Sequence, residues 1–109
     1  MNQDLGDITP PELDEKIKRG DDFDLIDVRE QHEWNLGRLP GAKLVPLGTL
    51  GKALDTLDPE REIVLYCRSG ARSARAKGFL QASGFPKARN LLGGILRWSD
   101  EVDPSMAKY

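Results

Sequence analysis

The chain has 109 residues, of which 39% are hydrophobic and 31% are charged, which fits one globular domain with a single core. Its 16 basic and 18 acidic residues leave a net charge of −2, without the basic patch that would favour nucleic acid as a partner. We expect no membrane partner, because no apolar run approaches the ~20 residues of a membrane span, and no signal peptide, because the amino terminus is acidic and polar.

The first predicted helix covers residues 10–19. Thr9 is the expected N-cap, proline follows at the first helical position, and Glu12 can close a capping box with Thr9. Gly20 is the expected stop. This helix has the features of a scaffold element and carries no obvious chemistry.

Residues 23–28 form the first predicted strand, and a charged cluster after it opens a short helix that ends near Gly37. Asp27 and Arg29 lie at the carboxyl end of this strand, where ligand crevices form in open α/β sheets. We expect the two side chains to pair with groups of the loop that follows Cys67, described below as the active loop, and to support its shape, with direct substrate contact as the alternative. His32 is expected on the surface.

A turn-rich connection over residues 37–42 leads to a short predicted strand at residues 43–45. A helix that starts at Pro46 should cover Leu50 and Leu54. Residues 58–61 then turn the chain into the next strand.

Residues 63–73 carry the strongest signal in the sequence. An apolar, β-branched run predicts a buried strand over residues 63–66, Cys67 ends it, and a helical pattern follows the small residues after it. A tight loop that enters a helix leaves backbone N–H groups without partners, and these form an anion-binding nest. A thiol at the mouth of such a nest, beside Arg68 and Arg72, is expected to have a lowered pKa and to be a thiolate at neutral pH.

The spacing of the loop narrows its chemistry. Cys67 and Arg72 frame a Cys-x4-Arg loop, one residue shorter than the Cys-x5-Arg loop of cysteine phosphatases, so its ring of N–H donors suits a small anion. An inert buried cysteine is the alternative, but two arginines beside it would place charge in a core without reason. The candidate catalytic residue is Cys67, and the candidate substrate-binding residues are Arg68, Ser69, Gly70, Ala71, Arg72 and Ser73.

The rest of the chain continues the alternation of helices and strands. A helix should bury Ala76, Phe79, Leu80 and Ser83, a strand is expected at residues 88–92, and a last helix should begin at Gly93 and pack Trp98 under the active loop. We therefore predict an α/β fold with a mostly parallel sheet of four to five strands and helices on both faces. The single domain would span residues 1–109, with its core at about residues 8–98 and a polar tail at residues 99–109.

The loop sequence Cys67-Arg68-Ser69-Gly70-Ala71-Arg72-Ser73 resembles the active-site loop of the single-domain rhodaneses, a thiosulfate sulfurtransferase family. The Asp27-Val28-Arg29-Glu30 segment and the Gly-Gly…Trp pattern near the carboxyl terminus are also similar to that family. One difference is Arg38, which stands where the family usually has a histidine. The end of the chain is similar to rhodanese domains attached to adenylyltransferases that activate sulfur carriers.

The resemblance implies a sulfurtransferase that carries sulfane sulfur as a Cys67 persulfide, from a small anionic donor such as thiosulfate to cyanide, a thiol or a protein acceptor. It implies neither an organic cofactor nor a metal. A sulfur-carrier protein or a cysteine desulfurase is a possible partner, and a reactive thiol favours a reducing, cytoplasmic location. Two alternatives remain, a cysteine phosphatase or arsenate reductase, and a binding module without catalysis.

Overall fold

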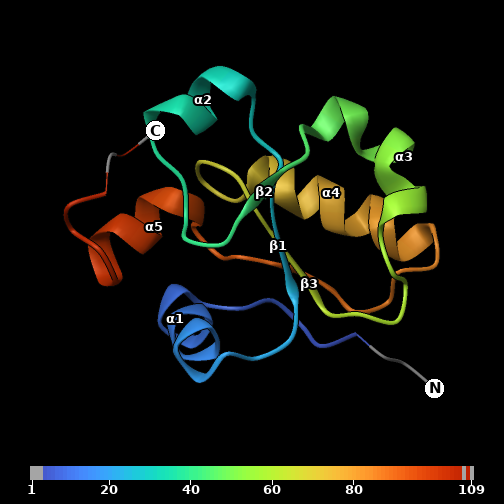
Figure 1. Ribbon diagram of the computed structural model, residues 1–109, viewed down its shortest axis with the longest axis horizontal. Helices are drawn as coiled ribbons and strands as arrows, with labels where there is room; N and C mark the ends of the chain where they lie inside the picture. The colour runs from blue at the N-terminus through green and yellow to red at the C-terminus, as the bar shows by residue number, and fades with distance from the viewer. Residues whose placement is uncertain (1–3, 107, 109) are drawn as a thin grey trace.

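The computed structural model describes residues 4–106 and 108 and shows a parallel sheet with helices on both faces (Figure 1). Its strands have the order β2-β1-β3-β4. They are β1 (Asp24–Asp27), β2 (Lys43–Leu44), β3 (Ile63–Tyr66) and β4 (Ala88–Asn90). All pairings between them are parallel, and an isolated parallel bridge joins Ile8 to Leu91 beyond β4. The predicted α/β class and the mostly parallel sheet are confirmed.

The helices are α1 (Pro10–Arg19), α2 (Gln31–Leu36), α3 (Leu50–Ala53), α4 (Ala71–Ala82) and α5 (Gly94–Glu101), with the short 3-10 turns Leu47–Thr49 and Leu54–Thr56 on either side of α3. The predicted capping box of α1 is present: the N–H of Thr9 donates to Glu12 Oε1 at 2.9 Å, and the N–H of Glu12 donates to Thr9 Oγ1 at 3.4 Å. Gly20 ends α1 with φ of 70°.

Strand β3 forms the centre of the core, because both of its faces are covered. Ile63 and Leu65 pack with Cys67 into the cluster on the side of α3 and α4, whereas Val64 and Tyr66 point into the cluster on the side of α1 and α5. This alternation follows the two-residue period of a strand, and burial of each large apolar side chain contributes about 1.5–3 kcal/mol. The period also decides that Cys67 lies on the α4 side of the sheet.

One expectation about the buried face of α4 needs correction. The side chains of Ala76 and Leu80 are buried, but Ser83 is exposed and Phe79 is 41% exposed, because Phe79 borders a groove beside α3 instead of the core. Trp98 is a buried aromatic as predicted, and it belongs to the cluster on the α1 side with Leu13 and Tyr66.

The carboxyl-terminal segment packs against the domain, whereas a polar tail was expected from residue 99. Helix α5 continues to Glu101, Ser99 is buried, and the hydroxyl of Ser99 donates to the carbonyl of Met106 at 2.9 Å. The boundary expected after residue 98 therefore falls inside α5. Positions 107 and 109 of the expected tail lie outside the described residues.

Candidate active site

The predicted loop lies at the carboxyl end of β3 and enters α4 directly. Gly70 is the residue before the first turn of α4 and has φ of 106°, a left-handed conformation that suits glycine because it has no side chain. Cys67, Gly70 and Ser73 are buried, Arg72 is half-buried, and Arg68, Ser69 and Ala71 are exposed. The structure thus brings the predicted loop residues together, with the sulfur beneath the loop and the charged Arg68 outside.

The Cys67 sulfur is buried, and donors point at it. The N–H of Gly70 donates to Cys67 Sγ at 3.1 Å, and Ser73 Oγ lies 3.4 Å from the same atom. Burial is the largest influence on the pKa of this thiol and raises it. Hydrogen bonds from the Ser73 hydroxyl and from the N–H groups of Ser73, Gly70 and Ser69 together outweigh burial, so the pKa of Cys67 is lowered from its ordinary value.

The first turn of α5 explains why N–H groups, and not carbonyls, face the sulfur. The N–H of Ile95 donates to the Cys67 carbonyl at 2.9 Å, and the N–H of Leu96 donates to the Arg68 carbonyl at 3.1 Å. A Cβ atom on Gly94 would lie 2.5 Å from both carbonyl oxygens, and φ at Gly94 is +59°. Glycine at this position therefore lets α5 approach the loop. The N–H groups of α5 then hold the loop carbonyls away from the thiol.

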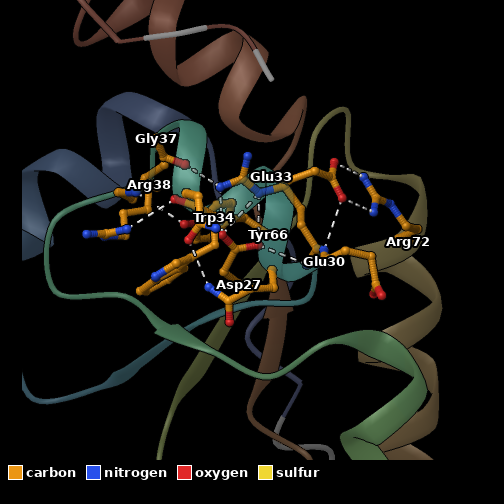
Figure 2. A network of polar contacts seen from close by, with 12 residues as sticks. Asp27, Glu30, Glu33, Trp34, Gly37, Arg38, Tyr66 and Arg72 are labelled. Atoms are coloured by element: carbon orange, nitrogen blue, oxygen red, sulfur yellow. Dashed lines mark hydrogen bonds and ion pairs between the residues drawn. The ribbon is translucent and has the colours of Figure 1, made fainter.

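Arg72 is held by an acidic residue of α2, as Figure 2 shows. Its two terminal nitrogens donate to the two carboxylate oxygens of Glu33, each at 2.8 Å. These hydrogen bonds are the largest influence on the pKa of Glu33, which falls from 4.5 to about 2. Glu33 therefore holds Arg72 in place at the end of the loop.

Asp27 and Arg29 form a buried ion pair, and neither is exposed to solvent. Arg29 Nε donates to both carboxylate oxygens of Asp27 at 3.0 Å, and its Nη2 donates to the Gly37 carbonyl at 2.6 Å. The Arg29 guanidinium also lies 5.6 Å from the centre of the Tyr66 ring. These contacts join the end of β1 to the carboxyl end of α2, the helix that carries Glu33.

Arg38 turns toward α2. Its guanidinium lies 4.6 Å from the centre of the Trp34 ring, and Nη1 donates to the Trp34 carbonyl at 3.1 Å. Trp34 is half-buried under this contact. His32 is exposed, as predicted.

Two site residues were missed by sequence reasoning. Glu33 was assigned only to a charged helix start, although its spacing from Glu30 marks a capping box. Asn90 was assigned only to a strand, but Ser73 Oγ donates to Asn90 Oδ1 at 2.6 Å, and Asn90 Nδ2 donates to the Gly70 carbonyl at 3.3 Å. A polar residue at the carboxyl end of a strand was the available signal for Asn90.

The surroundings of the loop include one open groove of about 710 Å³. Its lining includes Glu30, Leu47, Leu50, Arg72, Arg75 and Phe79. Within residues 4–106 and 108, no three His, Cys, Asp or Glu side chains are grouped so that they could hold a metal ion. No helix in this part of the chain is long and apolar enough to cross a membrane.

Comparison with known proteins identifies the family. The model of the rhodanese-like domain matches residues 9–101. The chain belongs to the rhodanese-like domain family.

Rhodanese relatives and structures cover most of the chain. The probable adenylyltransferase/sulfurtransferase MoeZ of Mycobacterium tuberculosis is 39% identical over 94% of this chain, which spans only 26% of the length of MoeZ. The putative sulfurtransferase YtwF of Bacillus subtilis is 37% identical over 92% of this chain and 96% of its own length. The crystal structure of a rhodanese-like domain protein from Staphylococcus aureus has a TM-score of 0.83 and 30% identity, covering 96% of this chain and 99% of that one.

Proposed function

We propose that this chain is a sulfurtransferase that carries sulfane sulfur as a persulfide of Cys67. The observation that carries the proposal is the N–H of Gly70, which points at Cys67 Sγ at 3.1 Å within a Cys-x4-Arg loop. A lowered thiol pKa supports a thiolate nucleophile, and inward N–H groups can stabilise a second, negatively charged sulfur attached to the first.

In the first step, the Cys67 thiolate attacks the outer sulfur of a donor such as thiosulfate. A bond forms between the two sulfurs, the bond between the outer sulfur and the sulfonate sulfur breaks, and sulfite leaves with that electron pair. The cysteine becomes a persulfide anion, and the total charge is conserved. Arg68 is exposed and increases the local concentration of anionic donors, while Arg75 adds positive charge to the groove beside the loop.

In the second step, a thiophilic acceptor takes the outer sulfur. Cyanide attacks this sulfur, the bond between the two sulfurs breaks, thiocyanate forms, and the Cys67 thiolate is restored with the electron pair of the broken bond. A thiol or a protein acceptor would react in the same way in the cell. Neither step requires a metal or an organic cofactor, since sulfur itself is the transferred group.

The proposed partner is based on a relative in which the matching domain is part of a longer chain. In MoeZ the matching region is about a quarter of a longer chain whose name joins an adenylyltransferase to a sulfurtransferase. We therefore propose a sulfur-carrier protein as the acceptor, a small anion or a cysteine desulfurase as the donor, and the cytoplasm as the location.

Intact-mass spectrometry tests the reaction directly. After treatment with thiosulfate the protein should gain the mass of one sulfur atom, and cyanide should remove it. The Cys67→Ser variant should gain nothing under the same conditions. An unmodified wild-type mass after thiosulfate treatment would contradict the proposal, and release of phosphate from an aryl phosphate would favour a phosphatase instead.

A further inference from the structure

Asn90 lies behind the active loop at the end of β4 and contacts it at two points. Its side-chain oxygen is 2.6 Å from Ser73 Oγ, and its side-chain nitrogen donates to the Gly70 carbonyl at 3.3 Å. Ser73 Oγ is in turn 3.4 Å from the Cys67 sulfur. Ser73 is fully buried and Asn90 is 6% exposed, so the polar groups of both side chains must find their hydrogen-bond partners within the protein.

The Gly70 carbonyl fixes the orientation of the Asn90 amide. With the amide reversed, its oxygen would face the Gly70 carbonyl oxygen, and two acceptors would oppose each other. The Asn90 oxygen therefore faces Ser73, and an amide oxygen can only accept a hydrogen bond. Ser73 has a single hydroxyl hydrogen, so it can donate either to Asn90 or to the Cys67 sulfur, but not fully to both.

We propose that Asn90 is a positioning residue that competes with the Cys67 sulfur for the hydroxyl hydrogen of Ser73. Asn90 thereby favours the states in which this sulfur carries no charge. The competition itself needs only the geometry described here, whereas its effect on sulfur loading rests on the proposed function.

The consequence differs between the states of the sulfur. In the thiol, the S–H group can donate to Ser73, which donates to Asn90 in a continuous chain of hydrogen bonds. In the thiolate, the Ser73 hydroxyl must turn to the sulfur, and the buried Asn90 oxygen loses its donor. In the persulfide the charge lies on the outer sulfur, so the inner sulfur is neutral and the Ser73 hydroxyl can return to Asn90. Asn90 thus opposes the free thiolate and favours the loaded state.

Charged groups on the surrounding elements act on Cys67 in addition to this hydrogen-bond network. Arg72 interacts electrostatically with the Cys67 sulfur while it is held by Glu33 of α2. The other charged residues on the elements around the loop are Arg68 in the loop, Asp27 and Arg29 at the end of β1, Glu30 before α2, Arg75 and Lys77 on α4, Arg89 on β4, and Arg97, Asp100 and Glu101 on α5. All of them remain in place when Asn90 is changed, so they do not account for differences between Asn90 variants.

The test is a titration of the thiolate by its ultraviolet absorbance, with the Cys67→Ser protein as the blank. Cys67 is the only cysteine of the chain, so the signal has one source. Asn90→Leu removes the acceptor, frees the Ser73 hydroxyl for the sulfur, and should lower the pKa of Cys67 by about one unit. In a Ser73→Ala background the same substitution should leave the pKa unchanged. An unchanged or raised pKa in Asn90→Leu, or an equal shift without Ser73, would overturn the proposal.

Asn90→Asp is the matched second variant. It also loses the bond to the Gly70 carbonyl, but it is a stronger acceptor for Ser73, and it should raise the pKa of Cys67. Its added negative charge raises this pKa as well, so the variant is compared with Asn90→Asp in the Ser73→Ala background, where only the charge acts. The rise should be larger when Ser73 is present, and an equal rise in both backgrounds, or a lowered pKa in Asn90→Asp, would contradict the proposal. This comparison decides the question if circular dichroism shows that the leucine variant is unfolded.

Sulfur loading adds a readout that depends on the proposed function. In fixed mixtures of thiosulfate and sulfite at a pH where Cys67 is ionised, intact-mass spectrometry gives the ratio of persulfide to free protein. For Asn90→Leu this ratio should fall by about tenfold, the factor that corresponds to one pKa unit. An unchanged ratio would overturn the loading part of the proposal. A wild-type protein without any sulfur adduct would contradict the proposed function, whereas the expected titration shifts would still support the role of Asn90.

Discussion

Glu33 on α2 and Arg72 in the first turn of α4 are 39 residues apart in the chain, yet they bind through two hydrogen bonds of 2.8 Å each. The pair connects α2 to the end of the active loop. Because an arginine and a carboxylate that bind through both pairs of atoms constrain each other in angle as well as in distance, α2 fixes the direction in which Arg72 leaves the loop.

Glu33→Gln should weaken this connection. The Arg72 side chain is 34% exposed, so solvent screens the pair, and we expect a loss of roughly 1–2 kcal/mol in the free energy of unfolding at neutral pH. Chemical denaturation measures this loss. Glu15→Gln is the matched control. Glu15 is 74% exposed, and its carboxylate lies as far as 3.7 Å from Arg19, so its loss should change the free energy of unfolding by well under ~1 kcal/mol. Equal losses in both variants would contradict the role of Glu33.

The same pair makes a prediction about pH. The pKa of Glu33 is lowered in the folded protein from 4.5 to about 2, so its stabilisation is fully present above 4.5 and is lost as the pH falls toward 2. The difference in stability between wild-type and Glu33→Gln should therefore shrink across this interval. Denaturation curves recorded at a series of pH values check it, and a difference that stays constant down to the lowest pH would disprove the assignment.

Gly94→Ala tests the contact between α5 and the active loop. The added Cβ would meet two carbonyl oxygens at 2.5 Å and must displace the loop, and the left-handed backbone of Gly94 adds about 1–2 kcal/mol of strain. We expect kcat/KM for thiosulfate to fall by roughly 10²-fold, since a displacement of about 1 Å in an active site has that effect.

Gly78→Ala is the control for this substitution. Gly78 lies inside α4 with nothing within 4 Å of an added Cβ, and alanine there should raise the free energy of unfolding by about 0.5–1 kcal/mol without loss of activity. If Gly94→Ala retained full activity, the close approach of α5 would not be needed for the geometry of the loop.

Asp27→Asn leaves Arg29 charged and buried without its carboxylate. Removing one partner of a buried pair costs about 3–5 kcal/mol, so this variant should be strongly destabilised in denaturation experiments. Asp22→Asn breaks the ion pair with Arg61, but Asp22 is 86% exposed and its loss should cost at most about 1 kcal/mol. Similar losses in the free energy of unfolding for the two substitutions would show that the buried Asp27–Arg29 pair contributes no more to stability than an exposed pair.

Arg68→Ala should raise KM for thiosulfate by about threefold at low salt and leave kcat nearly unchanged, because an exposed charge attracts the donor without touching the reacting sulfur. The difference should diminish at high ionic strength. Lys18→Ala on α1 removes the same charge from a helix that contributes no residue to the loop and should leave KM unchanged. Equal effects of both variants, or an effect that does not depend on salt, would contradict local steering by Arg68.

The strand, the loop and the helix around Cys67 could be predicted because their signals are local. A β-branched run, a glycine before a helix and the spacing of one cysteine and one arginine lie within eleven residues, 63–73. Alternation of such units then predicts the parallel sheet. The sequence also placed Asp27 and Arg29 correctly at the end of β1.

The partners of the loop could not be predicted, because they come from elements that are distant in the sequence. Many acidic residues could have paired with Arg72, and only the packing of α2 selects Glu33. Asn90 and Phe79 show the same limit: a strand pattern does not tell which loop lies beside its last residue, and a helical pattern does not tell where a groove interrupts the core. The burial of Arg29 is also invisible in the sequence, since charged residues are usually exposed.

The hydrogen bonds from α5 to the Cys67 and Arg68 carbonyls link this helix to opening motions of the active loop. Two backbone amides of α5, those of Ile95 and Leu96, are protected from solvent only while these carbonyls accept from them. Their deuterium exchange therefore reports each opening of the loop, so a helix with no reactive side chain becomes the natural sensor of how often the thiol is uncovered.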